Sequence, residues 1–446
     1  MEQDYLLKIG NKNKTIMFTI FVTIIVLIEL FKNIVNIPGF DNSIILFIVE
    51  YMIITLIFLV YAKKKILTMK NVFVFVFSFM LGLSPIFYYI NMGEINESHF
   101  TIIILSYLAL AVGMNLNIKW KNKEICYESK YRIKLEDICI IIGLISLISN
   151  VYYIFINRAY LLSGNLEAGR TAALSSNGIL IVLMNIVIPM IGLLFDIYLK
   201  KGSKKSLFFV IIFIFGSSIC YLIQGTRTPI MKIIILMLLI YNFRRNIKNR
   251  TVILIAIMGI VLLIGMQVVR AQRSNESIGF FKSLLNTLQN GSVNLQYVQK
   301  TFSEKEPYQN GYTYLINLIM LLPGEDIDFT LWLKDKLNLD FAGGGVTPTI
   351  IGESYINFGN TGAYIILFLI GILINYIDNR YSYNKSEVFW ICYFVTIFID
   401  SFRGGIANIE VNLLIYFGLY FFIEKILKIS NKKVKEHSNE NSNDRT

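Results

Sequence analysis

The sequence predicts an all-α polytopic membrane protein with about twelve transmembrane helices, both termini in the cytoplasm and one large external loop that carries short helices. Two observations lead to this fold class. The 446 residues are 55% hydrophobic and only 16% charged, with a mean hydropathy of +0.58, which is far from the balance of a soluble domain. In addition, apolar runs of about 20 residues, the length that crosses a bilayer, recur along the chain.

These runs divide the chain into four predicted parts. Residues 1–268 contain the first nine spans, which lie near residues 16–35, 44–61, 72–90, 100–118, 138–156, 179–199, 207–223, 229–241 and 252–269. Residues 269–346 form the external loop. Residues 347–428 hold a glycine-rich segment and the last three spans, near residues 359–377, 388–402 and 411–427, and residues 429–446 form a polar cytoplasmic tail.

Lysine and arginine gather in every second connection of this arrangement, for example at residues 63–70, 119–134, 200–205 and 244–250. The positive-inside rule places these connections and both termini in the cytoplasm. The formal net charge of +12 follows from the same bias, so it does not indicate a nucleic acid partner.

Cysteine and histidine are too sparse for several kinds of site. The four cysteines have no paired spacing, so we expect neither a disulfide framework nor a metal site, and no cofactor. The only histidines are His99 and His437, which argues against a histidine-based zinc site and a Ser-His-Asp triad. The first apolar run is long and no small-residue cleavage pattern follows it, so we expect no cleavable signal peptide.

The loop at residues 269–346 is too long for a simple connection, and loops of this size are usually functional or disordered. Its amphipathic pieces at residues 280–288, 314–322 and 329–339 argue against disorder. None of these pieces is long enough to span a membrane, so we expect interfacial or packed external helices.

Arginine is distributed differently from lysine. The predicted external side holds Arg158, Arg170, Arg227, Arg270, Arg273 and Arg403, whereas lysine dominates the cytoplasmic connections. The positive-inside rule does not explain this difference, but the bidentate fit of a guanidinium group to phosphate oxygens does. We therefore predict an external pocket for a ligand that carries a phosphate or pyrophosphate group.

The positions of these cations sharpen the prediction. Arg227 lies in the turn QGTRTP between two spans, where Gly225 permits a tight turn. Lys232 is one turn into the next helix, where an ammonium group must face a cavity or a partner. Arg270 and Arg273 end the ninth span three residues apart, so they share one face of a helix. For these arginines we favour contact with the ligand.

For other arginines a structural explanation stands beside the functional one. Arg170 follows a glycine in a polar external loop and is a further candidate for ligand binding. Interfacial snorkelling explains Arg158 better than function does. Arg403 follows Asp400 by three residues, so an ion pair and a ligand contact explain it equally well.

The segment GGGVTPTIIGESYINFGNTGAY at residues 343–364 precedes a long apolar run. Gly343, Gly344 and Gly345 leave backbone N–H groups free to approach an anion, although close helix packing explains them equally well. Glu353, the only acidic residue of the segment, either neutralises an arginine or acts as a general base, and we lean to the base. Tyr355 offers a ring for sugar stacking, although aromatic residues more often belong to a core or an interfacial belt.

Together these features resemble the bacterial oligosaccharide repeat-unit polymerases, the Wzy-type O-antigen and capsular polysaccharide polymerases. The matching features are the GTR turn at Gly225 to Arg227, the pair Arg270 and Arg273 at the end of a span, the large external loop and the GGG…TP…GESYINFG segment. They cover the second half of the chain, and the first half matches only in hydropathy. The related O-antigen ligases typically use an external histidine, and the position of His99 in a different loop favours a polymerase.

The resemblance implies a multi-pass protein of the bacterial cytoplasmic (inner) membrane that acts as a metal-independent glycosyltransferase. Its substrates are expected to be oligosaccharide repeat units linked to polyprenyl pyrophosphate. Arg227 and Arg270 are expected to stabilise the leaving pyrophosphate, with Glu353 as the base and with Arg273, Arg170, Arg403, Lys232, Gly343, Gly344, Gly345 and Tyr355 binding substrate.

Expected partners are the lipid bilayer and other polysaccharide-assembly proteins, such as a flippase and a chain-length regulator. The alternatives are a lipid-linked oligosaccharide flippase or transporter, and a glycan transferase similar to the O-antigen ligases. A flippase is expected to place its charges at the bilayer midplane and in both halves of the chain. The charged residues of this sequence instead cluster at one end of the predicted bundle.

Overall fold

The computed structural model describes residues 42–61, 67–92, 97–116, 118, 135–161, 178–248, 250–252, 254–255, 258–259, 265, 280–319, 328–340, 345–383 and 388–423. Within these ranges the regular elements are all helices, and no strand is present among them. The predicted span at residues 16–35, most of the one at residues 252–269 and the polar tail lie outside the described residues.

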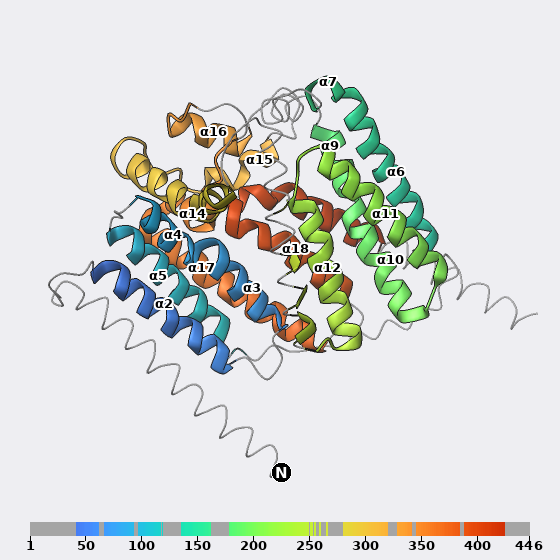
Figure 1. Cartoon of the computed structure of the whole chain (residues 1–446), viewed down its shortest axis with the longest axis horizontal. Helices are drawn as coiled ribbons and strands as arrows, with labels where there is room; N and C mark the ends of the chain where they lie inside the picture. The colour runs from blue at the N-terminus through green and yellow to red at the C-terminus, as the bar shows by residue number, and fades with distance from the viewer. Residues whose placement is uncertain are drawn as a thin grey trace, which may run out of the picture.

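Helices from the first part of the chain pack together with one helix from the last part. The first group comprises α2 (Asn42–Tyr61), α3 (Met69–Phe77), η1 (Ser78–Gly82), α4 (Ser84–Met92) and α5 (Glu97–Asn115). Helix α17 (Thr349–Tyr383) runs along α5 and also contacts α3 (Figure 1). The core of the protein therefore joins segments that are more than 200 residues apart in the sequence.

A second group of helices lies beside the first. It comprises α6 (Leu135–Ile156), α9 (Gly178–Asn185), α10 (Val187–Lys201), α11 (Lys204–Ile223) and α12 (Thr228–Arg245), with the short α7 (Arg158–Leu161) at the end of α6. Helix α18 (Val388–Gly404) contacts α12 and α10 on one side and α17 and α3 on the other, so it connects the two groups (Figure 1).

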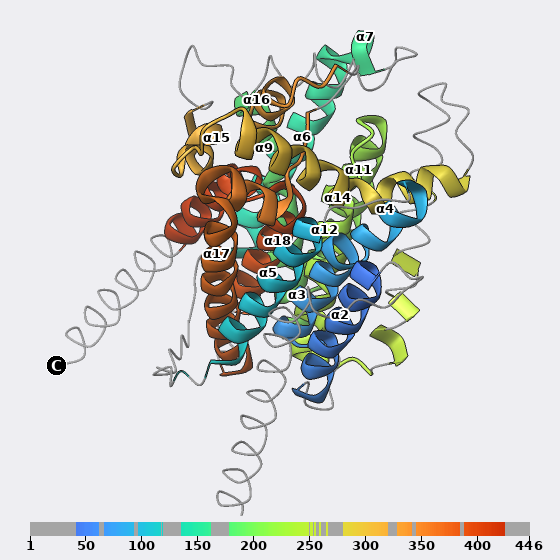
Figure 2. The same cartoon turned by 90° about the vertical axis from the view of Figure 1, so that its left-hand side faces the viewer.

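Helices from the predicted external loop cover one end of the bundle. These are α14 (Phe280–Glu304), η2 (Tyr312–Leu315), α15 (Ile316–Ile319) and α16 (Phe329–Lys336). Figure 2 shows α14 lying across the ends of the spanning helices rather than along them. The expectation that no piece of this loop is long enough to span was wrong for α14, which has 25 residues. Helix α14 is long enough to cross a membrane but too polar, so it is not among the helices that could span one.

Six helices among the described residues are long and apolar enough to cross a membrane. They are Met69–Asn91, Glu97–Asn115, Leu135–Ile156, Val182–Lys201, Lys204–Ile223 and Thr349–Arg380. Exposed apolar side chains, such as Ile148 and Phe155 on α6 and Phe215 on α11, give these helices the surface that a lipid environment requires. The all-α membrane fold is confirmed, whereas twelve spans and their orientation stay predictions.

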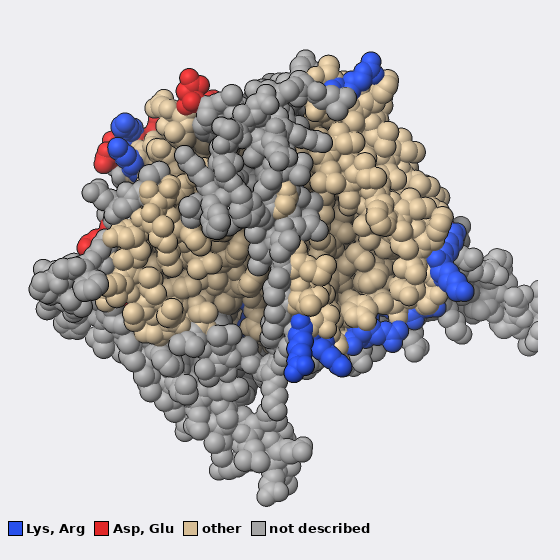
Figure 3. All heavy atoms as spheres, viewed as in Figure 1, with Lys and Arg blue, Asp and Glu red and all other residues tan. Residues whose placement is uncertain are grey.

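Charged side chains gather at two opposite edges of the molecule. In Figure 3, Lys and Arg line one edge of the molecule, a broad uncharged surface follows, and acidic residues lie at the opposite edge with further basic ones. Lys200 and Lys201 end α10, and Arg244 and Arg245 end α12. These ends are the ones that the positive-inside rule assigns to the cytoplasm.

Two predicted spans contain breaks. The span at residues 72–90 consists of α3, the π-helical turn η1 and α4, which meet at Gly82 and Ser84. The span predicted at residues 359–377 belongs to a longer helix that begins ten residues earlier, at Thr349. Non-helical backbone at Gly359 (φ 67°, ψ −160°) separates a short segment, Thr349 to Phe358, from the long remainder.

The closest approach between α5 and α17 depends on two glycines that face each other. A Cβ on Gly113 would overlap the carbonyl oxygen of Phe368, and a Cβ on Gly371 would overlap that of Leu110. Small residues allow helix backbones in a membrane to approach this closely, which increases their van der Waals contact.

We expect Gly113→Leu to lower the free energy of unfolding by about 1–3 kcal/mol or more, because the added side chain forces the two backbones apart. Denaturant titration in detergent measures the change. Gly418→Leu is the matched control, since a Cβ there would meet nothing within 4 Å. Equal effects of the two substitutions would contradict the close packing of α5 and α17.

Candidate functional site

Two turns that carry arginine meet where α12 begins and α18 ends. Arg227 is the N-cap residue of α12, and the turn before it is made possible by Gly225, whose φ is +68°. Arg403 lies in the last turn of α18 and its Nη1 is 3.5 Å from the hydroxyl oxygen of Thr228. Packing of α18 against α12 therefore brings together two arginines that are far apart in the sequence.

One helical turn below these arginines, Lys232 on α12 forms an ion pair with Asp400 on α18. Their side chains are only 13% and 12% exposed. The predicted need of the Lys232 ammonium for a partner is thus met by a carboxylate of the protein. Asp400, considered above as a partner of Arg403, forms this ion pair with Lys232. The part of Lys232 in substrate binding stays a prediction.

Glu353 is fully buried, in the short segment of α17 before the break at Gly359. Its Oε2 accepts a hydrogen bond from the backbone N–H of Ile406, and its Oε1 accepts from the N–H of Ala407 at 3.2 Å. The hydroxyl of Thr313 donates to Oε1 at 3.1 Å. The carboxylate therefore joins α17, the turn after α18 and the external helix η2. Its predicted role as a base stays a prediction.

The external loop binds the short segment of α17 where the helix breaks. The break at Gly359 leaves carbonyl groups without their usual helical partners. The N–H groups of Gln309 and Asn310 donate to the carbonyls of Ile356 and Asn357 at 3.0 and 3.1 Å. The loop thus replaces the hydrogen bonds that the break removes.

Side chains of the same region reinforce this contact. The amide of Asn357 donates to the hydroxyl of Thr313 at 2.6 Å and accepts from the N–H of Gly311 at 2.9 Å. Burial raises the pKa of the Tyr314 phenol to about 12, so the phenol stays protonated at neutral pH and donates to Ser354 Oγ at 3.4 Å. Hydrogen bonds from several donors therefore fix η2 against α17.

The remaining described candidates have contacts within the protein. Tyr355 is buried and its ring meets the ring of Tyr308 edge to face, with 5.9 Å between the centroids. Tyr308 is 42% exposed, so it is the better placed of the two for a ligand. Gly345 lies against Thr330 so closely that a Cβ would overlap it, and the N–H of Val346 donates to the carbonyl of Thr330. This contact gives Gly345 a packing role.

Five predicted site residues lie outside the described residues: Arg170, Arg270, Arg273, Gly343 and Gly344. Their roles stay predictions. The structure brings together Arg227, Arg403 and Lys232, and it places Glu353 against the turn that follows Arg403.

Sequence reasoning missed three residues of this region. Thr313 and Asn357 complete the hydrogen bonds around Glu353. Glu410, a second buried carboxylate, follows η3 (Ala407–Ile409) and is 5% exposed. A signal for Glu410 is present in the sequence, because it is a lone carboxylate immediately before the last apolar run.

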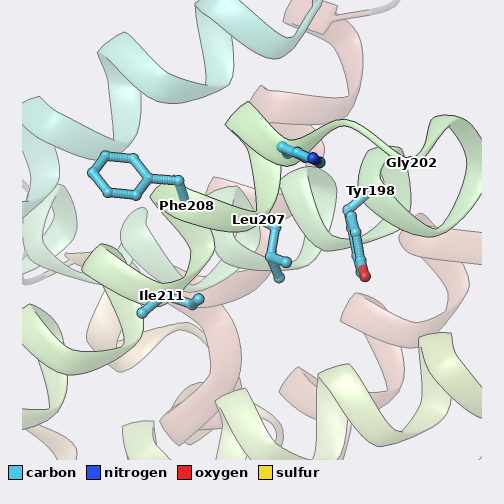
Figure 4. A pocket seen from close by; sticks show the side chains of 6 residues that line it. Tyr198, Gly202, Leu207, Phe208 and Ile211 are labelled. Atoms are coloured by element: carbon cyan, nitrogen blue, oxygen red, sulfur yellow. The ribbon is translucent and has the colours of Figure 1, made fainter.

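A shallow groove, shown in Figure 4, lies at the N-terminal end of α11, whereas the Arg227 turn follows the C-terminal end of that helix. It is lined by Tyr198, Gly202, Lys204, Leu207, Phe208 and Ile211. Most of this lining is apolar, and none of the predicted site residues contributes to it. The groove is therefore separate from the arginine-bearing turns.

We expect Lys232→Met or Asp400→Leu alone to destabilise the protein by about 3–5 kcal/mol, because each leaves a buried charge without its partner. The double substitution is expected to recover most of the loss, since apolar residues replace the whole pair. Thermal unfolding in detergent measures all three variants. Additive losses in the double variant would contradict the ion pair as the reason for the burial of Lys232.

No curated protein and no solved structure matches the chain. The family model described as O-antigen polysaccharide polymerase Wzy matches residues 15–434, nearly the whole length. The match includes the first half, for which the sequence features above gave only a resemblance in hydropathy. The chain therefore belongs to the O-antigen polysaccharide polymerase Wzy family, and it is a multi-pass membrane enzyme of polysaccharide biosynthesis that polymerises repeat units by glycosyl transfer.

Proposed function

We propose that this polymerase joins oligosaccharide repeat units linked to polyprenyl pyrophosphate, at the external face of the bacterial cytoplasmic membrane. A sugar hydroxyl of one lipid-linked unit attacks the anomeric carbon of the glycan on another. The bond between that carbon and the pyrophosphate oxygen breaks as the new glycosidic bond forms. The proton of the attacking hydroxyl is transferred to the departing pyrophosphate oxygen, so the products are the longer lipid-linked glycan and polyprenyl pyrophosphate.

The observation that carries the proposal is the meeting of the Arg227 and Arg403 turns at one end of the α12 and α18 pair. This end is opposite to the end where α12 finishes in Arg244 and Arg245. The positive-inside rule assigns the latter to the cytoplasm, which supports an external position for the two turns. Guanidinium groups at this position suit a pyrophosphate that is anchored in the outer leaflet.

Leaving-group stabilisation is the chemistry that these arginines supply. Negative charge develops on the pyrophosphate as its bond to the sugar breaks, and fixed cationic donors stabilise that charge. Arg227 and Arg403 provide donors in the described structure. Arg270 and Arg273, at the end of the ninth predicted span, and Arg170 complete the proposed set, with Lys232 below them. Metal independence is part of the proposal, because arginine takes the electrostatic role that Mg²⁺ has in many pyrophosphate reactions.

This proposal does not assign the base to Glu353, whose role as the base stays a prediction. Its carboxylate accepts hydrogen bonds from three groups of the protein and is fully buried, which favours a structural role.

The test is to incubate purified protein with a lipid-pyrophosphate-linked repeat unit in EDTA and to separate the products by gel electrophoresis. A ladder of polymers is the expected result. Unreacted substrate with folded protein in EDTA but a ladder after Mg²⁺ is added would overturn metal independence. Unreacted substrate in both conditions would overturn the proposed substrate.

We expect Arg227→Ala and Arg403→Ala each to lower the rate of polymerisation by about 10²-fold, the cost typical of losing one donor to a developing charge. Lysine at either position is expected to restore only part of the rate, because it lacks the bidentate geometry. Arg158→Ala is the control. Arg158 is exposed on α7 and its guanidinium carbon lies 4.6 Å from the centre of the Phe155 ring. Unchanged rates in Arg227→Ala and Arg403→Ala would remove both residues from the site.

A further inference from the structure

Glu353 supplies a helix cap from a different part of the chain. Helix α18 ends at Gly404, and Gly405 turns the backbone with a φ of +83°. The last helix, Ala407–Ile423, then begins, and its N-cap residue Ile406 makes no capping hydrogen bond with its own side chain. The first N–H groups of a helix need an acceptor, and a carboxylate also interacts favourably with the positive end of the helix dipole. Glu353 meets both needs.

The turn between the two helices is shaped around this carboxylate. A Cβ on Gly405 would overlap Oε2 of Glu353, so the glycine is required by its backbone conformation and by the space that Glu353 occupies. A second contact holds the same turn, because the amide of Asn317 on α15 donates to the carbonyl of Ala407 at 2.8 Å. The turn is therefore tied to α17 and to the external layer.

The opposite side of the carboxylate connects to the external loop. Thr313 donates to Oε1 of Glu353 and accepts from Asn357, which in turn accepts from the N–H of Gly311. A continuous series of hydrogen bonds thus runs from the loop, through Glu353, to Ile406 and Ala407, three and four residues after Arg403. Fully satisfied buried polar networks of this kind hold one arrangement of the groups that they join.

We propose that Glu353 is a positioning residue that holds the turn after α18 so that Arg403 lies beside the Arg227 turn, ready to receive the pyrophosphate of the substrate. This inference rests on the proposed function, because it acts through Arg403. The carboxylate does not touch the substrate. It fixes the backbone three and four residues after Arg403, and it makes the position of that arginine depend on the packing of the external loop.

A double-mutant cycle tests the inference. Glu353→Gln places an amide N–H where an acceptor is needed, so it loosens the turn without changing the size of the side chain. We expect it to lower kcat/KM for the lipid-pyrophosphate-linked repeat unit by about tenfold in the otherwise unchanged protein. In the Arg403→Ala background the same change is expected to cost less than about twofold, because the residue that Glu353 positions is already absent.

Two other outcomes would overturn the inference. If Glu353→Gln costs the same factor in both backgrounds, then Glu353 acts independently of Arg403, either as the base or through stability alone. A limb of the pH–rate profile that Glu353→Gln removes in the Arg403→Ala background as well would identify the base, because a positioning role acts only through Arg403. Rates are normalised to folded, monodisperse protein, so that a lower yield is not counted as a lower rate.

A milder variant keeps the test usable where Glu353→Gln does not fold. Thr313→Val removes one of the three donors to the carboxylate with little change in volume, and it is expected to show the same dependence on Arg403 with a smaller factor. Ser149→Ala is the control for loss of a buried hydroxyl, since Ser149 bonds within α6 to the carbonyl of Ile145. Its effect is expected to be the same with and without Arg403. The unaltered protein must first form a polymer ladder, so failure of the proposed function is seen separately from failure of the cycle.

Discussion

The arrangement of this protein depends on one constraint, which is that backbone N–H and C=O groups freed by a broken helix must find new partners away from water. Two breaks meet this constraint with groups from elsewhere in the chain. At Gly359 the N–H groups of the external loop bind the carbonyls that the break exposes, and after Gly405 the carboxylate of Glu353 binds the N–H groups of the next helix. Each break therefore creates a docking point between an external segment and the bundle.

The candidate site follows from this arrangement. Helices α12 and α18 form part of a closely packed core, and their ends carry Arg227 and Arg403 into one place. The ion pair of Lys232 and Asp400 joins the same two helices one turn below. The ion pair and the hydrogen bonds of Glu353 thus hold the helix ends that carry the two arginines. The arginines themselves lie at the end of the bundle. Arginines held at the ends of closely packed helices suit the recognition of an anionic group at a membrane surface.

The six helices of the described residues that are long and apolar enough to cross a membrane coincide with predicted spans, because the signal for such helices is local. Long apolar runs, alternating lysine-rich connections and the turn at Gly225 each depend on neighbouring residues only. The partners of buried polar groups depend on tertiary packing, so they were harder to predict. Asp400 is three residues from Arg403 but pairs with Lys232, which is 168 positions earlier, and nothing in either local sequence indicates that choice. The lone carboxylate Glu353 was recognised as important, but its partners Ile406, Ala407 and Thr313 were not predictable from spacing.

The break at Gly359 also divides one continuous helix into two parts that belong to different layers. The part from Asn360 onward packs along α5 within the bundle, with Gly371 at the closest approach. The part from Thr349 to Phe358 is hydrogen-bonded to the external loop and to the turn after α18. The part from Thr349 to Phe358 therefore belongs to the outer layer, and it is joined to the long part of α17 at Gly359. Glu353 thus connects the outer layer to the arginine-bearing turn by hydrogen bonds, in addition to the covalent connection at Gly359.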